Sequence, residues 1–235
     1  MKLNTNSNTY ILAYASLLVI AVAFVLAYFS QALKPIQDKN VALDKKKQII
    51  AALNIRDVND NQVEEYYNKL VEADEIINEK NEVLSAGKPG GENDGFKLNG
   101  GDFKAGKLAL FVCNVDGQKK YVMPVYGMGL WGGISGYIAI NADKETIYGV
   151  YFNHEGETAG LGAEIKDNQK WQQQFCGKHL FAEGNQDAVA LSVCKKVDNP
   201  ATQVDGVSGA TLTCDGVTRM IHEGLGKYLV FLKDK

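Results

Sequence analysis

The sequence of 235 residues is poor in the residues that metal sites, disulfide scaffolds and nucleic-acid binding surfaces need. It has only 4 cysteines and 3 histidines, and their spacing matches no zinc motif. Four cysteines are also too few for a disulfide-rich scaffold. The formal net charge is −3, so the chain lacks the basic excess of a nucleic-acid binding protein. These absences predict no metal ligands and no nucleic-acid partner.

The overall composition is otherwise that of a folded globular protein. Hydrophobic residues make up 46% and charged residues 23% of the chain, which argues against disorder throughout. Glycine is the one residue type in excess. It accounts for 24 of the 235 residues, roughly 10%, whereas its usual share is about 7%. These glycines cluster in short segments, and such clusters predict loops whose backbone closely approaches another group.

The amino-terminal region contains an apolar run that is typical of a membrane-spanning helix. No charged residue lies between Leu3 and Leu33, and Ser16 is the main interruption of the apolar residues 11–29. A helix of that length rises by roughly 28 Å, close to the ~30 Å of a bilayer core. A cleaved signal peptide is the alternative, but its apolar part is usually about 7–15 residues long. The sequence therefore predicts an uncleaved anchor.

The charges that flank the anchor predict its orientation poorly. The amino side has Lys2, whereas the carboxyl side has Lys34, Lys39, Lys45, Lys46 and Lys47. Positive charges tend to stay in the cytoplasm, so this count alone would place the bulk of the chain there. Long domains can be exported regardless of such charges, so the count does not decide the orientation.

Beyond the anchor, the hydrophobic pattern first predicts helices. Residues 41–53 have the pattern of a short amphipathic helix. Apolar residues recur at three- and four-residue spacing through residues 63–84, which predicts a second helix with an acidic, solvated face. Residues 87–101 are rich in glycine and predict a loop.

The rest of the chain changes to segments rich in Val, Ile, Tyr and Phe, which predict strands. These segments are residues 107–115, 120–126, 134–141, 146–153 and 188–193. Asp116-Gly117 is a good hairpin turn between the first two. Short helices are predicted over residues 169–175 and 217–229. The expected fold class is α+β, with one N-terminal transmembrane helix, a helical stalk, and a mixed or antiparallel sheet with flanking helices.

Residues 205–213 combine small residues and hydroxyls and run directly into the last predicted helix. The segment reads Asp-Gly-Val-Ser-Gly-Ala-Thr-Leu-Thr. The free N–H groups and the dipole of a helix start form a ready anion-binding site. Plain capping needs only one hydroxyl, from Thr211 or Thr213 with help from Asp215. On chemistry alone, a phosphate-ligand site and a plain helix cap are equally good interpretations.

Two further glycine-rich segments follow predicted strands. Residues 127–133 surround Trp131, which could pack in the core or lie beside a planar ligand. Residues 154–162 read His-Glu-Gly-Glu-Thr-Ala-Gly-Leu-Gly and contain no second histidine for a metal site. A serine hydrolase is also disfavoured, because no serine lies in a complete G-x-S-x-G motif.

The anchor and these three segments, in this order, resemble the family of the C subunit of the sodium-translocating NADH:quinone reductase. The G subunit of the Rnf electron-transport complex shares the same flavin-binding domain. Leu33-Lys34-Pro35 and residues 43–47 look more like the former. The most specific match is residues 205–213, which fit the flavinylation motif D-x-x-S/T-G-A-S/T-x-S/T. Residues 157–162 fit the motif E-T-P-G-L-G, except that Ala159 replaces the usual proline.

The resemblance implies an FMN that is attached to Thr213 through a phosphoester bond. It also implies that the other cofactor-binding residues come from the same three segments. Lys195 lies at the end of a predicted strand before the motif, and its charge suits either an offset to the phosphate or an ordinary surface lysine. The expected cofactor-binding residues are Asp205, Ser208, Gly209, Ala210, Thr211, Leu212, Gly129, Leu130, Trp131, Glu157, Thr158, Gly160, Leu161, Gly162 and Lys195. We expect no catalytic residue and no metal ligand in this chain.

The resemblance further implies a place in a multisubunit complex. The expected function is electron transfer through FMN in a complex that takes electrons from NADH to quinone and translocates sodium. The expected partners are other membrane, flavin and iron–sulfur subunits, and a flavin transferase that moves FMN from FAD during maturation. The alternatives are an Rnf-type flavin subunit and a membrane-anchored module that binds a phosphate ligand without a covalent bond.

The expected division of the chain follows from the same resemblance. Residues 1–9 form a cytoplasmic tail, residues 10–33 a transmembrane helix, residues 34–86 a helical stalk and residues 87–235 the FMN-binding domain. The family's transferase acts outside the cytoplasm. We therefore expect a single-pass protein of the inner membrane with its FMN domain on the periplasmic side. This expectation is opposite to the lysine count.

Overall fold

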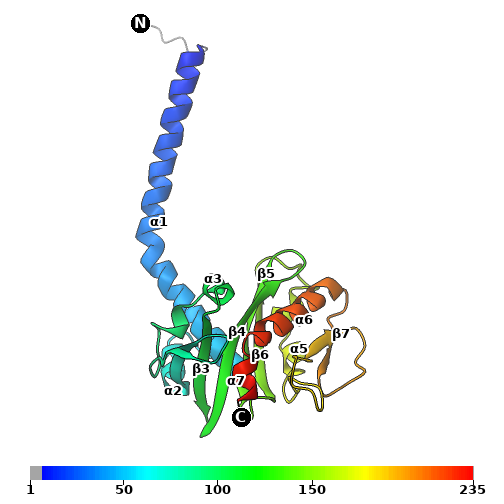
Figure 1. Ribbon diagram of the computed structural model, residues 1–235. Helices are drawn as coiled ribbons and strands as arrows, with labels where there is room; N and C mark the ends of the chain where they lie inside the picture. The colour runs from blue at the N-terminus through cyan, green and yellow to red at the C-terminus, as the bar shows by residue number, and fades with distance from the viewer. Residues whose placement is uncertain (1–6, 235) are drawn as a thin grey trace. The chain divides into compact units, whose positions relative to one another are not determined.

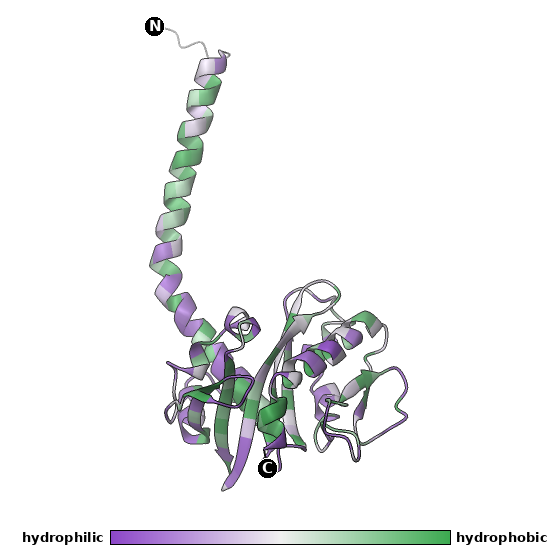
Figure 2. Ribbon diagram, in the orientation of Figure 1, coloured by the Kyte–Doolittle hydropathy of each residue, from purple (hydrophilic) through white to green (hydrophobic). Residues whose placement is uncertain are grey.

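The computed structural model describes residues 7–234, and the chain divides into two compact units, Met1–Asp44 and Lys45–Lys235. The long helix α1 (Asn8–Ala52) begins in the first unit and ends in the second (Figure 1). Its most apolar window has a mean hydropathy of 2.5 and is 0% buried, so the helix is long and apolar enough to cross a bilayer. Figure 2 shows this apolar stretch in green. Most of the expected tail, residues 1–9, lies outside the described residues.

The amphipathic helix predicted over residues 41–53 is the last part of α1 and not a separate helix. Its apolar residues Ile49, Ile50 and Leu53 are buried in the second unit. The apolar face that the sequence shows there is therefore a core face.

The second unit is built on a six-stranded sheet in the order β2-β1-β3-β4-β5-β6, in which all neighbouring strands are antiparallel. Four consecutive strands form successive hairpins: β3 (Leu108–Val115), β4 (Gln118–Met128), β5 (Gly133–Asn141) and β6 (Ile147–His154). Asp116 and Gly117 connect β3 to β4 with φ of 51° and 79°, as a tight hairpin turn requires. The predicted strands and turn of this region are confirmed.

The helix predicted over residues 63–84 is wrong beyond Leu70. Helix α2 (Val63–Leu70) ends there, and two strands follow, β1 (Val71–Ile77) and β2 (Val83–Ser85). Strand β1 pairs with β3 and so belongs to the sheet. The expected boundary between a stalk and the flavin domain at residue 87 stays a prediction.

An irregularity in β1 explains why the pattern indicated a helix. The pairing of β1 with β3 shifts register between Val71 and Ala73. As a result, the buried residues of β1 are Val71, Asp74 and Ile77, which lie three positions apart. A bulge has given this strand the spacing of a helix.

Asp74 is fully buried, although the sequence pattern places it on a solvated face. Its carboxylate accepts hydrogen bonds from the backbone N–H groups of Lys88 at 3.1 Å, Asp94 at 3.1 Å and Phe96 at 3.3 Å. Three glycines pass so close to it that a Cβ would collide with Asp74 or its neighbouring backbone: Gly87, Gly91 and Gly95. This carboxylate therefore organises the glycine-rich loop that follows β2.

The remaining elements surround the sheet. They are η1 (Gly95–Lys97), α3 (Gly100–Lys104), α4 (Glu164–Asp167), α5 (Gln169–Gln173), β7 (Ser192–Cys194), β8 (Gln203–Asp205), α6 (Thr211–Gly226) and α7 (Leu229–Lys233). Strands β7 and β8 form a small parallel pair, so the strand predicted over residues 188–193 is shorter and later than expected. The fold is α+β, as the sequence predicts.

Helix α6 packs closely on β4, with β7 also against it (Figure 1). A Cβ on Gly127 would lie 2.6 Å from the Met220 side chain, and one on Gly224 would lie 2.7 Å from Val125. These glycines let the helix approach the strand more closely than any other residue would allow. The close packing fixes the start of α6 beside the end of β4.

Candidate functional site

Helix α6 begins at Thr211 without a capping side chain. Its N-cap is Ala210, which makes no side-chain hydrogen bond to the helix. The interpretation of Thr211 or Thr213 as the cap is therefore wrong. The N–H groups of the first turn and the positive end of the helix dipole remain available to an anion.

The Thr213 side chain lies in the first turn of α6 and contacts Glu157. Its hydroxyl donates a hydrogen bond of 2.6 Å to Glu157 Oε2. Glu157 Oε1 accepts a hydrogen bond of 2.9 Å from the backbone N–H of Trp131. Both polar side chains are buried, with Thr213 1% and Glu157 7% exposed. The carboxylate thus joins α6 to two loops, residues 129–132 and 155–163.

The surroundings of Glu157 favour its charged form. Burial alone would raise its pKa, but hydrogen bonds from the Thr213 hydroxyl and the N–H groups of Trp131 and Leu130 act in the opposite direction. The nearby His154 adds a favourable charge, and the net result is a pKa below the ordinary value of 4.5. Glu157 is therefore an ionised acceptor at neutral pH.

Glycines let the three segments meet at this carboxylate. A Cβ on Gly162 would lie 2.5 Å from Glu157 Oε2 and 2.6 Å from Thr213 Oγ1. A Cβ on Gly129 would collide with Glu157, and one on Gly216 would collide with the backbone at the end of β4. The absence of a side chain at these positions is what leaves room for the buried pair.

Exposed apolar side chains flank the buried pair on its outer side. Trp131 is 69% and Leu130 47% exposed, and Leu212 beside Thr213 is 57% exposed. Leu161, next to Gly162, is 42% exposed. Trp131 therefore does not pack in the core, which was one of the two positions that the sequence allowed. Apolar side chains beside an uncapped helix start suit a flat aromatic ligand that carries a phosphate.

The first part of the 205–213 segment lines a cavity of about 300 Å³ beside the start of α6. The predicted site residues in its wall are Lys195, Asp205, Ser208, Gly209 and Thr211. Gly209 has a φ of 76°, a conformation that glycine adopts without strain. The Lys195 side chain is exposed and brings a positive charge to this wall.

The remaining predicted residues lie close to the buried pair of Thr213 and Glu157 or to this cavity. Ala210 is 5% exposed and belongs to the core. The carbonyl of Thr158 accepts hydrogen bonds of 3.1 Å from the N–H groups of Leu161 and Ala163, which closes a tight turn. Gly160 has a φ of 72° within that turn. The contacts of these residues with a cofactor stay predictions.

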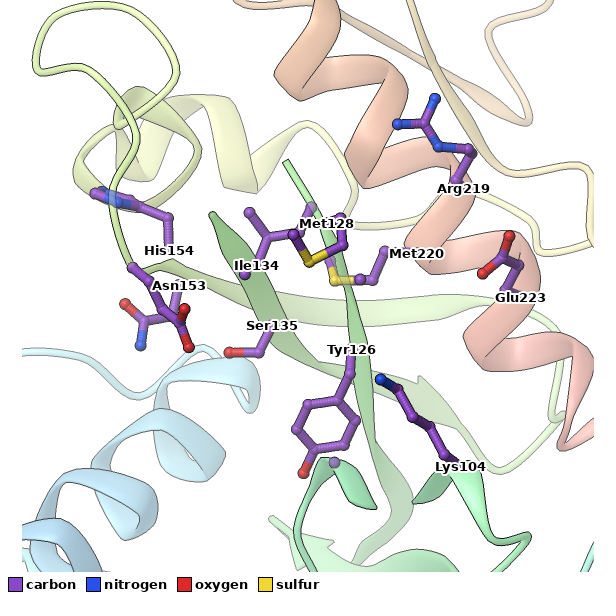
Figure 3. Close-up of a pocket in the computed structure, with 14 residues that line it drawn as sticks. Lys104, Tyr126, Met128, Ile134, Ser135, Asn153, His154, Arg219, Met220 and Glu223 are labelled. Carbon is purple, nitrogen blue, oxygen red and sulfur yellow. The ribbon is translucent and has the colours of Figure 1, made fainter. Parts of the chain in front are cut away.

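A larger cleft of about 660 Å³ lies beside the end of β4 (Figure 3). The two glycine-rich segments noted in the sequence contribute to its lining, with Gly127, Met128, Gly133, His154 and Glu155. Its walls come from several elements and include Lys104, Tyr126 and Arg219. Nearby, Asn153 Oδ1 is buried, and no hydrogen-bond partner for it lies in the part of the chain that the structure describes. No motif joins Lys104, Tyr126 and Arg219, because each comes from a different strand or helix.

The pH dependence of stability tests the charge of Glu157. Because folding lowers its pKa, Glu157 contributes stability that is fully present above its unfolded pKa and is lost as pH falls through the folded value. Glu157→Gln should therefore be less stable than the wild type at neutral pH. The difference should shrink as pH falls below about 4.5. Urea unfolding of both proteins from neutral pH to about pH 3 measures this difference in the free energy of unfolding. A difference that does not depend on pH would contradict a charged Glu157.

Comparison with known proteins adds to this geometry. A family model described as the FMN-binding domain matches residues 129–226, a range that contains the three segments joined at the buried pair. The C subunit of the Na(+)-translocating NADH-quinone reductase of Haemophilus ducreyi is 31% identical over 255 residues, covering 99% of this chain and 97% of that relative. The protein of the same name from Pseudomonas aeruginosa is 29% identical and covers 95% and 94%.

Solved structures of proteins with the same name are also similar to this chain. The crystal structure of the C subunit of the Na(+)-translocating NADH-quinone reductase from Parabacteroides distasonis matches with a TM-score of 0.78 and 36% identity, covering 86% of this chain and 98% of that one. The crystal structure of Shewanella oneidensis NqrC matches with a TM-score of 0.65 and 26% identity, covering 83% and 100%. The fold is thus that of proteins with these names.

Proposed function

This chain belongs to the family of the C subunit of the Na(+)-translocating NADH-quinone reductase, and we propose that it carries FMN as a phosphoester on Thr213. It is a flavin electron-transfer subunit of an NADH–quinone reductase complex, and other subunits of that complex are its partners. The relatives named above all come from this reductase, which disfavours the Rnf-type alternative.

The observation that carries the proposal is the position of the Thr213 hydroxyl. It lies in the first turn of α6, whose N-cap residue Ala210 supplies no capping oxygen. A phosphodiester on this hydroxyl would keep one negative charge beside the positive end of the helix dipole. The hydroxyls of Ser208 and Thr211 belong to residues that line the neighbouring cavity, where they suit hydrogen bonds to the same group.

The surrounding residues fit FMN in shape and polarity. Gly209 lines the cavity beside the start of α6 and carries no side chain, which leaves room for the ribityl chain. Leu130, Trp131 and Leu161 are exposed and suit contact with an aromatic ring. When bound, FMN supplies electron transfer, and the residues of this chain bind and orient it. An exposed ring site would let redox partners approach closely.

The chain works with other proteins. In this proposal, NADH, quinone and sodium are handled by neighbouring subunits, and this chain is not catalytic by itself. A flavin transferase attaches the FMN. It forms a bond between the phosphorus of the FMN half of FAD and Thr213 Oγ1, and AMP leaves.

The membrane arrangement is part of the same proposal. Helix α1 is the single-pass anchor, and the FMN domain lies on the extracytoplasmic side. Three of the flanking lysines have partners in the second unit: Lys45 with the carbonyls of Phe96 and Leu98, Lys46 with Glu92, and Lys47 with Asp60. These lysines have a structural role, so the lysine count is a poor guide to orientation.

Expression with and without an active flavin transferase tests the attachment. With the transferase, the intact mass of the exported wild-type chain should increase by one FMN less one water, and its band should fluoresce in a denaturing gel. Without the transferase, neither signal should appear. A wild-type chain that stays unmodified, while the same transferase modifies a control substrate, would contradict the covalent bond and favour a module that binds its ligand non-covalently.

A further inference from the structure

The hydroxyl that would receive FMN is closed off in the structure. Thr213 is 1% exposed, and its hydroxyl is bound to the buried Glu157 carboxylate. The Gly162 backbone lies directly over both, since even a Cβ there would collide with each of them. A phosphorus atom must come within bonding distance of Oγ1 to be attacked, and this arrangement leaves no space for it.

One hydrogen bond joins the loop of residues 157–162 directly to α6 in this closed position. It runs from the Thr213 hydroxyl to the Glu157 carboxylate, and the charged acceptor makes it about twice as strong as a hydrogen bond between neutral groups. The loop also places the exposed Leu161 against Gly209. Gly160 and Gly162, on either side of Leu161, give the backbone freedom to move.

Glu157 is held from its other side by a different loop. Its Oε1 atom accepts the N–H of Trp131, and the N–H of Leu130 also binds the carboxylate. The carboxylate is therefore already ionised and oriented toward Thr213 before any cofactor is present.

We propose that Glu157 is a positioning residue that keeps Thr213 unavailable to the flavin transferase until the hydrogen bond between them breaks and residues 158–162 lift away from α6. This inference rests on the proposed function, in which Thr213 is the attachment site. The reactive species is the open conformation, in which the hydrogen bond from the Thr213 hydroxyl to Glu157 is broken.

Attachment of FMN removes the closed arrangement permanently. Thr213 Oγ1 forms a bond to the phosphorus of the FMN half of FAD, the bond from that phosphorus to AMP breaks, and the hydroxyl proton is released to solvent. No atom is oxidised or reduced. The resulting ester oxygen has no proton to donate to Glu157. A phosphodiester anion would also face a buried carboxylate, and two like charges in a dry site repel strongly. The closed arrangement cannot re-form after attachment.

The rate of FMN attachment to full-length variants tests the proposal. Glu157→Ala removes the acceptor and should be modified about tenfold faster or more than the wild type, because the hydroxyl no longer has to break a hydrogen bond to a charged group before it reacts. Glu157→Gln keeps a neutral acceptor and should be intermediate. Glu155→Gln changes an exposed neighbour and should react at the wild-type rate. The measurement is intact mass over time with excess FAD and transferase.

Two controls separate this effect from general destabilisation. Ile138→Val shortens a fully buried side chain of β5 away from the loop, and should leave the attachment rate unchanged. Thr213→Val removes the donor, and should speed amide hydrogen exchange in residues 158–163 without any transferase present.

An unchanged or slower rate in Glu157→Ala would overturn the proposal, and a slower rate would mean that the carboxylate assists the attack. An equal acceleration in Ile138→Val would also overturn it, because unfolding would then explain the effect. If the wild type and every variant stay unmodified while a control substrate reacts, the proposed function fails instead.

Discussion

Replacing Thr213 with alanine should abolish covalent FMN completely. Alanine has no oxygen that can form the phosphoester, and we expect no other hydroxyl of the segment to substitute for Thr213. The variant should have the mass of the unmodified chain and give no fluorescent band under denaturing conditions. In the assembled complex, electron transfer from NADH to quinone through this chain should be lost with the flavin. Thr213→Ser should retain attachment, since serine keeps the nucleophilic hydroxyl.

The matched control is Thr211→Ala, which removes a hydroxyl one half-turn away in the same helix. Thr211 is exposed and lines the neighbouring cavity, whereas Thr213 is the residue bonded to Glu157. Thr211→Ala should therefore keep the fluorescent band. A fluorescent band in Thr213→Ala that disappears in Thr211→Ala would move the attachment site by two residues and contradict our assignment.

Replacing Asp74 with alanine should cost on the order of 3–5 kcal/mol of folding stability. The carboxylate is fully buried and accepts three backbone hydrogen bonds from the loop that follows β2. Without it, three N–H groups lose their acceptor in a place where water enters poorly. Chemical unfolding of the full chain in detergent, followed by circular dichroism, measures the loss.

Asp74→Asn separates charge from shape in the same experiment. Asparagine keeps one oxygen acceptor but places an N–H₂ donor against backbone donors, so we expect an intermediate loss of stability. The loop of residues 87–98 should also become sensitive to proteases in Asp74→Ala before the sheet unfolds. A loss below about 1 kcal/mol would show that Asp74 does not organise this loop.

Much of the sheet could be predicted because its pattern is local. Strands β3 to β6 alternate or run as apolar segments, and the Asp116-Gly117 pair marks a hairpin turn. Strand β1 could not be predicted, since a bulge spaced its buried residues like those of a helix. Asp74 was also missed. Its partners lie 14 to 22 residues further along the chain, and composition alone cannot place a buried carboxylate among them.

The candidate site was predicted segment by segment, whereas its assembly was not. The 205–213 motif pointed to Thr213, and the glycines pointed to loops with close backbone approach. The hydrogen bond between Thr213 and Glu157 joins residues 56 positions apart, and no local pattern encodes it. The absence of a capping side chain could not be predicted either. Several residues near the start of α6 carry hydroxyls of the kind that cap helices, and the sequence does not say which of them does so.

The order of the strands has a consequence for biosynthesis. Each of β4, β5 and β6 pairs with the strand made just before it, so these hairpins can form while the chain is still emerging. Helix α6 lies near the carboxyl end, and its packing on β4 must wait for residues that are made about a hundred positions later. Thr213 belongs to those late residues, so its burial against Glu157 can follow only after α6 has been made and has packed on the sheet. A transferase that acts between the synthesis of α6 and its packing would meet the hydroxyl before the loop of residues 157–162 closes over it.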